Sequence, residues 1–448
     1  MKKVITYGTF DLLHQGHINL LRNAKALGDY LIVGVTSENY DQYRGKLNVS
    51  QTVSERIENV RATGLADEIV VEEYEGQKID DIKRLKIDIF AIGSDWMGRF
   101  DYLNEYCKVV YLERTKGISS TRLRDEKHPM IHLGIVGCGR IANRFVAESK
   151  FVSGLTVDGV FNPHILSAQQ FAQQHELSFG IDDYTEFLKR INAVYIASPH
   201  DTHYGYAKAA LESGKHVLCE KPMTLTKKES VELFSIARER KLILLEAIKT
   251  AYCPGFQRMV SCAKSGKIGR IIHVDATFTK LVPAHARELR DDGVGGSALE
   301  LATYPLLAIL SLLGNKYEDI SFVSYQANGR AVDLFTRIEL LYSSAMAQAK
   351  VGLGAKSEGS LVVTGTRGYI YVPAPWWKTE YFELRYENEK DTEKNFYKFS
   401  GDGLRYEIVE FLNCIASEKM KDEACECSSG IASILEEYKK GKRTRYFQ

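Results

Sequence analysis

The feature that most constrains the fold is a strand–glycine–helix opening that occurs twice in the chain. Residues 4–8 are mainly apolar and end in Gly8, and a helical pattern follows over residues 18–24. Residues 131–137 repeat this arrangement, and a second helical pattern begins near Ile141. Such an opening is typical of the first unit of a parallel α/β sheet. The sequence therefore predicts two separate parallel domains.

The 448 residues suffice for about three domains of ordinary size. A short charged segment with a proline, residues 125–129, is the expected linker. After residue 250, long strand patterns follow one another with few helices between them, which favours an antiparallel sheet. We expect an α/β fold with parallel domains at 1–127 and 131–250. An α+β domain with an open, mainly antiparallel sheet is expected at 251–448, including a helix over 296–313 and a last helix over 404–418.

Composition and net charge argue against several classes of protein, namely nucleic-acid-binding, membrane and disulfide-rich proteins. The net charge is +1, which provides no general field for nucleic acid or an acidic membrane surface. The apolar stretch at 306–313 is too short to span a bilayer. The eight cysteines are too sparse for a disulfide scaffold and include no CxxC pair. We expect a cytoplasmic protein with reduced thiols, no structural metal, no membrane association and no nucleic-acid partner.

The first candidate site is the segment GTFDLLHQGH at residues 8–17. His14 and His17 are three residues apart at the start of a helix, so they share one face. Helix N-termini attract anions, and Gly16 lets a phosphate approach the backbone. Two imidazoles placed there can stabilise a phosphoryl group during transfer.

These residues resemble the nucleotidyltransferases with an HxGH motif, and among them most closely the glycerol-3-phosphate cytidylyltransferases. The segments GSDW (93–96), GRFD (98–101) and RTKGISST (114–121) add to the resemblance, which covers roughly residues 1–126. It implies a Rossmann-like domain in which His14 and His17 stabilise the α-phosphate of CTP while an alcohol phosphate attacks and pyrophosphate leaves. Lys46 would neutralise the triphosphate, and Mg²⁺ would accompany it. The implied nucleotide-binding residues are Gly8, Thr9, Phe10, Asp11, Gly16, Asp95, Arg114, Thr115 and Ser119.

One position departs from that family. The family carries a second arginine downstream of the one that matches Arg56, and here Gly64 stands in its place. Arg61 is a candidate replacement, and part of the phosphate binding depends on this position.

The second candidate site is GCGRIA at residues 137–142, a GxGxxA pattern between a strand and a helix. The first glycine permits the tight turn, and the second lets a pyrophosphate approach. The next strand ends near Asn162, where an acidic residue would favour NAD. Because Asn162 would not repel a 2′-phosphate, NADP and NAD both stay open as the cofactor.

The triplet Glu220-Lys221-Pro222 gives residues 131–448 a resemblance to the Gfo/Idh/MocA oxidoreductases. It implies that Lys221 lies beside the nicotinamide and the substrate and acts in proton transfer. Tyr304 is a second candidate proton carrier, and Glu300, four residues earlier, is a candidate substrate ligand. The cofactor-binding residues expected in this half are Gly137, Gly139, Arg140, Ile141, Asn162, Ser198, His200, His203 and Glu220.

Together the two sites predict a bifunctional enzyme. The C-terminal half would reduce a sugar phosphate to a polyol phosphate with NAD(P)H, and the N-terminal half would convert it with CTP into a CDP-polyol and pyrophosphate, for teichoic-acid or capsule synthesis. Two alternatives stay open, namely that the activities are uncoupled or that one half is a non-catalytic ligand-sensing domain. We also expect a homo-oligomer. Several cations are expected to face the substrate: Lys280, His285, Arg287 and Arg290.

Overall fold

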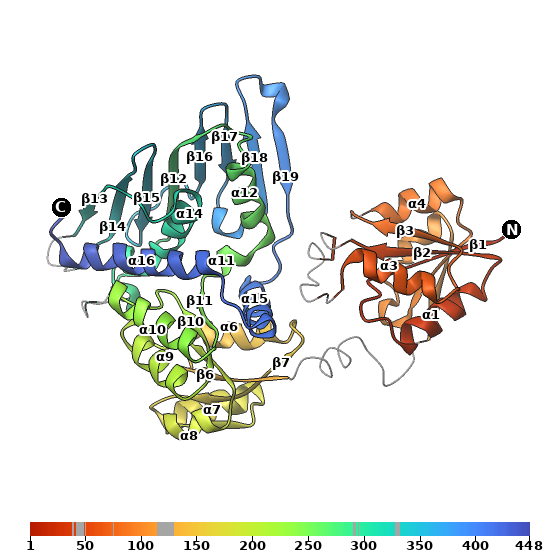
Figure 1. The fold of residues 1–448 in the computed structure, drawn as a ribbon, viewed down its shortest axis with the longest axis horizontal. Coiled ribbons are helices and arrows are strands. Elements are labelled where there is room, and N and C mark those ends of the chain that lie inside the picture. Colours follow the sequence, from red (N-terminus) through yellow and green to blue (C-terminus); the bar gives the residue numbers. More distant parts are fainter. Residues whose placement is uncertain are drawn as a thin grey trace. The chain divides into compact units, whose positions relative to one another are not determined.

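The chain forms two compact units in the computed structural model, Met1–Met130 and Ile131–Gln448, each described by itself (Figure 1). The structure describes residues 1–37, 40–41, 49, 51–74, 76–113, 130–289, 293, 295–327 and 332–448. Among these residues, no helix has both the length and the apolar character needed to cross a bilayer.

The N-terminal unit is a parallel sheet in the order β3-β2-β1-β4-β5. Period-two alternation sends neighbouring side chains of β1 to opposite faces: Val4 packs with Leu21 of α1, and Ile5 packs with Ile82 of α4. Burial on both faces explains why the strands are almost uniformly apolar. The strands are β1 (Lys3–Gly8), β2 (Tyr30–Thr36), β3 (Glu68–Glu72), β4 (Ile89–Gly93) and β5 (Lys108–Leu112), and the helices are α1 (Gln15–Lys25), α3 (Val53–Ala62) and α4 (Gln77–Leu85).

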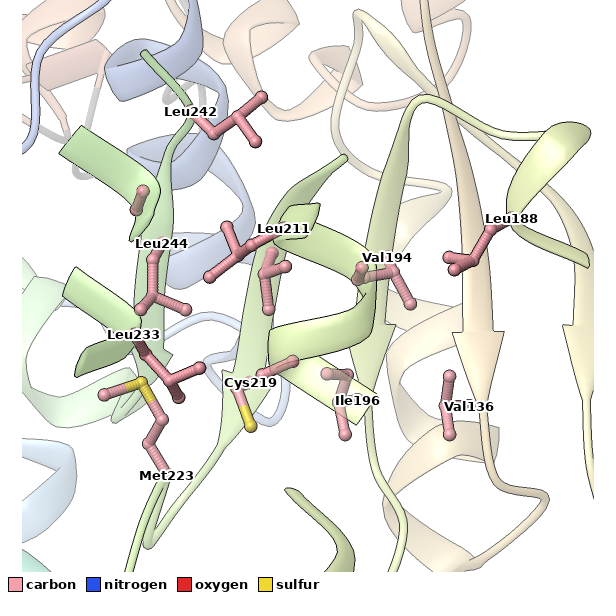
Figure 2. Packing of buried hydrophobic residues seen from close by; sticks show 14 of the residues in the cluster. Val136, Leu188, Val194, Ile196, Leu211, Cys219, Met223, Leu233, Leu242 and Leu244 are labelled. Atoms are coloured by element: carbon pink, nitrogen blue, oxygen red, sulfur yellow. The ribbon is translucent and has the colours of Figure 1, made fainter. Parts of the chain in front are cut away.

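The second unit begins with another parallel sheet, in the order β11-β10-β9-β6-β7-β8. Figure 2 shows the apolar core on one of its faces, where Val194 and Ile196 of the sheet pack with Leu211 and Leu233 of two helices. The strands are β6 (Ile131–Val136), β7 (Leu155–Phe161), β8 (Phe179–Ile181), β9 (Ala193–Ile196), β10 (His216–Glu220) and β11 (Leu244–Ala247). The helices are α6 (Arg140–Ser149), α7 (Ile165–His175), α8 (Tyr184–Lys189), α9 (His203–Glu212) and α10 (Lys227–Glu239).

The rest of this unit is built on a mixed sheet of nine described strands, β19-β18-β17-β16-β12-β15-β14-β13-β20. Only the pairs β12–β15 and β13–β20 are parallel, which confirms the prediction of a mainly antiparallel sheet. The strands are β12 (Ile271–Thr279), β13 (Asp319–Tyr325), β14 (Phe335–Leu341), β15 (Met346–Gly352), β16 (Leu361–Gly365), β17 (Tyr369–Val372), β18 (Tyr381–Arg385), β19 (Glu393–Phe396) and β20 (Thr444–Phe447).

The helices of this part differ from the predictions in two places. The single helix expected over 296–313 is two helices, α13 (Ser297–Leu301) and α14 (Thr303–Leu313). Pro305 has no N–H to donate to the carbonyl four residues earlier, so the helical ladder is interrupted there. The last helix is α16 (Asp422–Lys440), which was not predicted and follows α15 (Leu404–Ser417). The remaining helices are α11 (Lys249–Tyr252) and α12 (Pro254–Lys264).

Candidate active sites

The first site lies where the N-terminal sheet reverses its winding. β1 and β4 are neighbours, and β2 and β5 continue on opposite sides of them. Ligands of open α/β sheets bind at the carboxyl ends of the strands at such a switch point. The segment after Gly8 and the segment after Gly93 therefore lie at the same edge of the sheet, at the ends of neighbouring strands, which is why two motifs 85 residues apart belong to one candidate site.

The HxGH histidines form the start of α1. His14 is the N-cap, and its Nδ1 accepts hydrogen bonds from the backbone N–H groups of Gly16 at 3.1 Å and His17 at 3.4 Å. The rings of His14 and His17 stack with centroids 3.8 Å apart, and the edge of Phe10 meets His17 at 5.4 Å. Because Nδ1 of His14 accepts, its proton belongs on Nε2. The arrangement presents an imidazole N–H donor at a helix N-terminus, as phosphoryl transfer requires.

A buried network fixes the loop that carries these histidines. Thr9 donates to Asp41 at 2.9 Å, and the guanidinium of Arg56 contacts Asp41 at 3.2 Å and donates to the carbonyl of Thr9 at 2.8 Å. Asp11 accepts from the backbone N–H of Gln51 at 3.0 Å. Thr9 and Asp11 are thus buried supports of the loop.

Two loop residues adopt unusual backbone conformations. Phe10 and Leu12 have φ of 53° and 46°, in the left-handed region that L residues seldom occupy. Phe10 is buried in the core, so it supports the loop from within. A turn held so firmly in a sparsely populated conformation is typical of a functional site.

Part of the predicted nucleotide site falls outside the described residues: Lys46, Arg114, Thr115, Ser119 and the side chain of Asp95. The departure from the family at Gly64 lies at the end of α3, where the glycine has φ of 66°. Arg61 is exposed and pairs with Glu58 within the same helix.

The second site uses the switch point of the second parallel sheet, between β6 and β9. Gly137 has φ of 99°, and a Cβ there would lie 2.8 Å from the carbonyl oxygen of Ala197, so only glycine fits this turn. Gly139 is the N-cap of α6, and a Cβ on it would meet no atom within 4 Å. The open space over Gly139 fits the close approach of a pyrophosphate to the backbone.

A cavity of about 510 Å³ adjoins this turn and brings the predicted oxidoreductase residues together. Its wall contains residues from the ends of β6, β9, β10 and β11 and from α13, α14, α15 and β12. The predicted residues in the wall are Gly139, Arg140, Ile141, Ser198, His200, His203, Glu220, Lys221, Glu300 and Tyr304. Asn162, at the end of β7, is not among them; its side-chain oxygen accepts from the N–H of His164 at 2.9 Å.

Lys221 connects the two sides of this cavity, the end of β10 and the helices α13 and α14. Its ammonium donates to the backbone carbonyl of Glu300 at 2.9 Å and lies 5.9 Å from the ring centroid of Tyr304. Glu220 accepts from the Tyr195 hydroxyl at 2.6 Å and from the Lys221 N–H at 3.2 Å. The ammonium of Lys221 and the phenol of Tyr304 can each deliver a proton to a carbonyl oxygen in this space.

Two histidines complete the wall beside Lys221. His203 is fully buried, with Nδ1 2.9 Å from the carbonyl of Pro222 and Nε2 2.9 Å from that of Ser198, so it holds the two strand-end loops together. Burial and the nearby Lys221 lower the pKa of His200 to about 2. His200 is therefore neutral at physiological pH. Among the described residues, no group of three or more His, Cys, Asp or Glu side chains could hold a metal ion.

The cavity is rich in positive charge. Six lysines and arginines and four glutamates line it among the described residues. Lys280 and Arg287 are in the wall as predicted, and Arg287 contacts Glu300 at 3.3 Å. His285 is exposed outside it, and Arg290 lies beyond the described residues. Such a surface suits an anionic ligand.

Four charged wall residues were not predicted: Arg144, Lys249, Glu288 and Glu407. Lys249 is two residues beyond the end of β11, and its position just after a parallel strand could have indicated that it lies at the site. Glu407 comes from α15, more than 150 residues later in the chain, and no local motif marks it.

Three family models match the chain. Residues 5–126 match the cytidylyltransferase-like family, residues 131–247 the oxidoreductase family with an NAD-binding Rossmann fold, and residues 256–371 the GFO/IDH/MocA C-terminal domain. A glycerol-3-phosphate cytidylyltransferase of Bacillus spizizenii is 48% identical over 126 residues, which are 28% of this chain and 97% of that protein. The chain belongs to the cytidylyltransferase-like and the GFO/IDH/MocA oxidoreductase families. It is a cytidylyltransferase domain fused to an NAD(P)-dependent oxidoreductase domain.

Relatives of the oxidoreductase domain cover most of the second unit. A scyllo-inositol 2-dehydrogenase (NADP(+)) of Bacillus subtilis is 26% identical over 323 residues, with 69% of this chain and 97% of that protein covered. A 3-ketoreductase of Actinomadura kijaniata, solved with NADP and TDP-benzene, shares the fold with a TM-score of 0.64 at 24% identity. That match covers 71% of this chain and all of the other.

The residues present fit an NAD(P) cofactor, because the Gly137 turn is obligatory and the space over Gly139 is open. Gly139 and the first residues of α6 would hold the pyrophosphate, and the cofactor would supply the hydride for a carbonyl group. For Mg²⁺, the described residues contain no group of three or more candidate side chains to hold the ion.

Proposed function

We propose that the oxidoreductase domain reduces the carbonyl group of a keto- or aldo-sugar phosphate to a hydroxyl, and that the cytidylyltransferase domain then activates the resulting polyol phosphate with CTP. In the first reaction the carbonyl carbon gains a hydride and the carbonyl oxygen gains a proton from Lys221 or Tyr304. In the second, a phosphate oxygen of the polyol phosphate attacks the α-phosphorus of CTP. The bond to the β-phosphate breaks, and a CDP-polyol and pyrophosphate result.

The observation that carries this proposal is that Lys221 shares one cavity with five other lysines and arginines, against four glutamates. Lys280 and Arg287 face the same space as Lys221 and Tyr304. An uncharged sugar needs no such charge, whereas a phosphate ester is recognised by several cations. A phosphorylated substrate therefore suits this cavity. The same phosphate group is the one that a cytidylyltransferase needs in its acceptor.

The cytidylyltransferase domain supports the second step through positioning and charge. His14 and His17 stack at the N-terminus of α1, where an N–H donor and the helix dipole both stabilise growing negative charge on a phosphoryl group. This chemistry needs no covalent nucleophile, because phosphoryl transfer depends mainly on orientation and electrostatic stabilisation.

The proposal is tested with the full-length chain, CTP, NADPH and a panel of phosphorylated carbonyl compounds: dihydroxyacetone phosphate, glyceraldehyde 3-phosphate, ribulose 5-phosphate and xylulose 5-phosphate. We expect NADPH oxidation with one of them and a CDP-polyol by mass spectrometry. The His14→Ala variant should oxidise NADPH without forming the CDP-polyol. NADPH oxidation that depends on prior CTP addition and on His14 would instead show that the oxidoreductase acts on a nucleotide-linked sugar.

We further propose that the CDP-polyol serves the synthesis of a cell-surface polymer of the teichoic-acid or capsular type. A CDP-polyol is an activated polyol phosphate, and consecutive transfer of polyol phosphates makes a phosphodiester polymer. Deletion of the coding sequence should remove the corresponding polyol from cell-wall hydrolysates, and His14→Ala should not restore it. Unchanged wall polyol content in the deletion strain would contradict this role.

A further inference from the structure

Helix α15 contributes a buried acid to the oxidoreductase cavity. α15 packs against α6, α11 and β11 (Figure 1). Glu407, in the first turn of α15, has no exposed surface and lines the cavity together with Lys249 and Tyr304. Glu407 therefore belongs to the wall of the space in which Lys221 acts, and both of its carboxyl oxygens are buried.

In the part of the chain that the structure describes, this carboxyl group has no hydrogen-bond partner. Among the described residues, none donates a hydrogen bond to either oxygen of Glu407, and no cation lies within 4 Å of them. The ammonium of Lys249 donates instead to the backbone carbonyl of Asp402 at 2.6 Å. Burial and the neighbouring Glu220 raise the pKa of Glu407 well above its usual range. These two effects outweigh that of Lys249, which lowers the pKa, and a buried carboxyl group with no cation in contact favours its uncharged form.

Other buried acids of this unit are explained by their surroundings. Glu220 accepts from Tyr195, Glu246 accepts from the N–H of Met223 at 2.8 Å, and Glu148 pairs with Arg405 at 2.7 Å. Of the described buried carboxyl groups, Glu407 is the one with both oxygens unsatisfied. Buried polar groups are nearly always hydrogen bonded, so this exception at a cavity wall points to a ligand as the missing partner.

The position of Glu407 favours the substrate over the coenzyme. The dinucleotide turn follows β6, and Lys249 follows β11, at the far end of the row β6-β9-β10-β11. α15 lies against α6 as well as against β11 and α11, and Lys249, which lines the cavity together with Glu407, belongs to α11. Gly139 and the start of α6 would hold the coenzyme, Lys221 at the end of β10 would lie beside it, and the space near Lys249 would be left for the substrate.

We propose that Glu407, in its uncharged form, is a substrate-contacting residue that donates a hydrogen bond to one hydroxyl or carbonyl oxygen of the substrate and accepts one from a neighbouring hydroxyl. The inference rests on the proposed function, since a sugar phosphate offers oxygens that both accept and donate. It makes Glu407 a specificity-determining residue. A site built to hydrogen bond a hydroxyl rejects the analogue that lacks it by large factors, because the buried group is left unpaired.

The test uses full-length Glu407→Leu and Glu407→Gln with the most rapidly reduced compound of the panel and its monodeoxy analogues. We expect the wild type to prefer the parent over one analogue by at least about tenfold in kcat/KM, and Glu407→Leu to lose that preference. Glu407→Gln should retain it, because an amide also donates and accepts. The matched control is Glu410→Gln in the same helix, whose carboxylate pairs with Lys421 at 2.7 Å and does not line the cavity.

The outcomes separate this inference from the proposed function. If Glu407→Leu is slower but discriminates among the analogues as the wild type does, the residue is structural and the inference is overturned. Weaker NADPH binding with unchanged discrimination would assign Glu407 to the coenzyme and also overturn it. If the wild type reduces unphosphorylated or CDP-linked sugars instead, the proposed function fails, and deoxy analogues of that substrate test Glu407.

A measurement that needs no turnover completes the test. The infrared difference spectrum of wild type against Glu407→Gln, recorded at pH 7 with NADP present, should contain the carbonyl band of a protonated carboxyl group that shifts in D₂O. Absence of that band would show an ionised Glu407 and overturn the inference, whatever the substrate.

Discussion

The ammonium group of Lys221 donates a hydrogen bond to the backbone carbonyl of Glu300 at 2.9 Å. This bond connects the end of β10 in the parallel sheet to α13, which packs against β14 and β15 of the mixed sheet. The lysine thus links the dinucleotide-binding part of the oxidoreductase domain to the part that supplies Tyr304. Its position depends on both parts being folded.

Replacing this lysine should abolish reduction and leave cytidylyl transfer intact. We expect Lys221→Met to lower kcat for NADPH oxidation by about 10²–10⁴-fold, the usual contribution of a positioned proton donor. Cytidylyl transfer to a supplied polyol phosphate should stay unchanged. Lys189→Met, at an exposed lysine paired with Glu186, is the control. Reduction at the wild-type rate in Lys221→Met would contradict the assignment.

His14 has a structural and a chemical role that substitutions can separate. His14→Ala removes both the N-cap and the imidazole, and loss of an N-cap costs about 1 kcal/mol in stability. His14→Asn keeps an oxygen that can accept from Gly16 and His17. We expect both variants to lose at least about 10²-fold in cytidylyl transfer. Only His14→Ala should lower the unfolding midpoint of the N-terminal unit, measured by urea titration; an active His14→Asn would show that the histidine acts only as a cap.

The two glycines of the dinucleotide turn should respond differently to alanine. At Gly137 a Cβ would be 2.8 Å from a carbonyl oxygen and the φ is 99°, so Gly137→Ala should destabilise the domain. At Gly139 the added methyl meets no protein atom, so Gly139→Ala should fold normally. It fills the space for the pyrophosphate, however, and should weaken NADPH binding at least about tenfold. Calorimetric titration of both variants checks this, and unimpaired NADPH binding by Gly139→Ala would contradict the site.

We expect the cations of the cavity to lower KM for phosphorylated substrates and to leave KM for unphosphorylated ones unchanged. We expect Lys280→Gln to raise KM for the sugar phosphate by about tenfold, because a cation on a phosphate contributes on the order of 1.4 kcal/mol or more. Reduction of the corresponding unphosphorylated sugar, however slow, should be unaffected. Lys356→Gln is a suitable control, since that lysine donates to the carbonyl of Thr279 and does not line the cavity. Equal effects on both substrates would refute phosphate recognition by Lys280.

Glu246 should make the stability of the oxidoreductase domain depend on pH. Burial raises the pKa of this carboxyl to about 7 from an ordinary value of 4.5. The folded state therefore holds a proton that the unfolded state releases above pH 4.5, and stability falls as the pH rises from 4.5 to about 7. The difference amounts to about 3 kcal/mol. Denaturant titrations across this range should show the fall in wild type and a flatter profile in Glu246→Gln; identical profiles would contradict it.

The predictable parts of this protein were those determined by short segments. A strand, a glycine turn and a helix are adjacent in sequence, so the turns at Gly8 and Gly137 and the placement of His14, His17 and Lys221 at strand or helix ends followed from local patterns. Pro305 could have indicated the break between α13 and α14. The regular apolar pattern on either side of it instead indicates one continuous helix.

The parts that could not be predicted depend on distant segments. Glu407 reaches the cavity only because α15 returns to α6 and β11, and nothing near residue 407 marks it as different from Glu410. The long helix α16 contains cysteine, serine and glycine in its apolar stripe, which weakens the amphipathic signal, and it is stabilised by packing on α10 and α14.

The most direct test of the coupled reaction follows one atom through both domains. The intact protein is incubated with CTP, the sugar phosphate and NADPH carrying deuterium at the transferable position, and the CDP-linked product is analysed by mass spectrometry. The coupled reaction predicts a CDP-polyol that contains one deuterium. A CDP-linked product without deuterium, formed while the deuterated coenzyme is oxidised, would contradict the claim that one domain makes the substrate of the other.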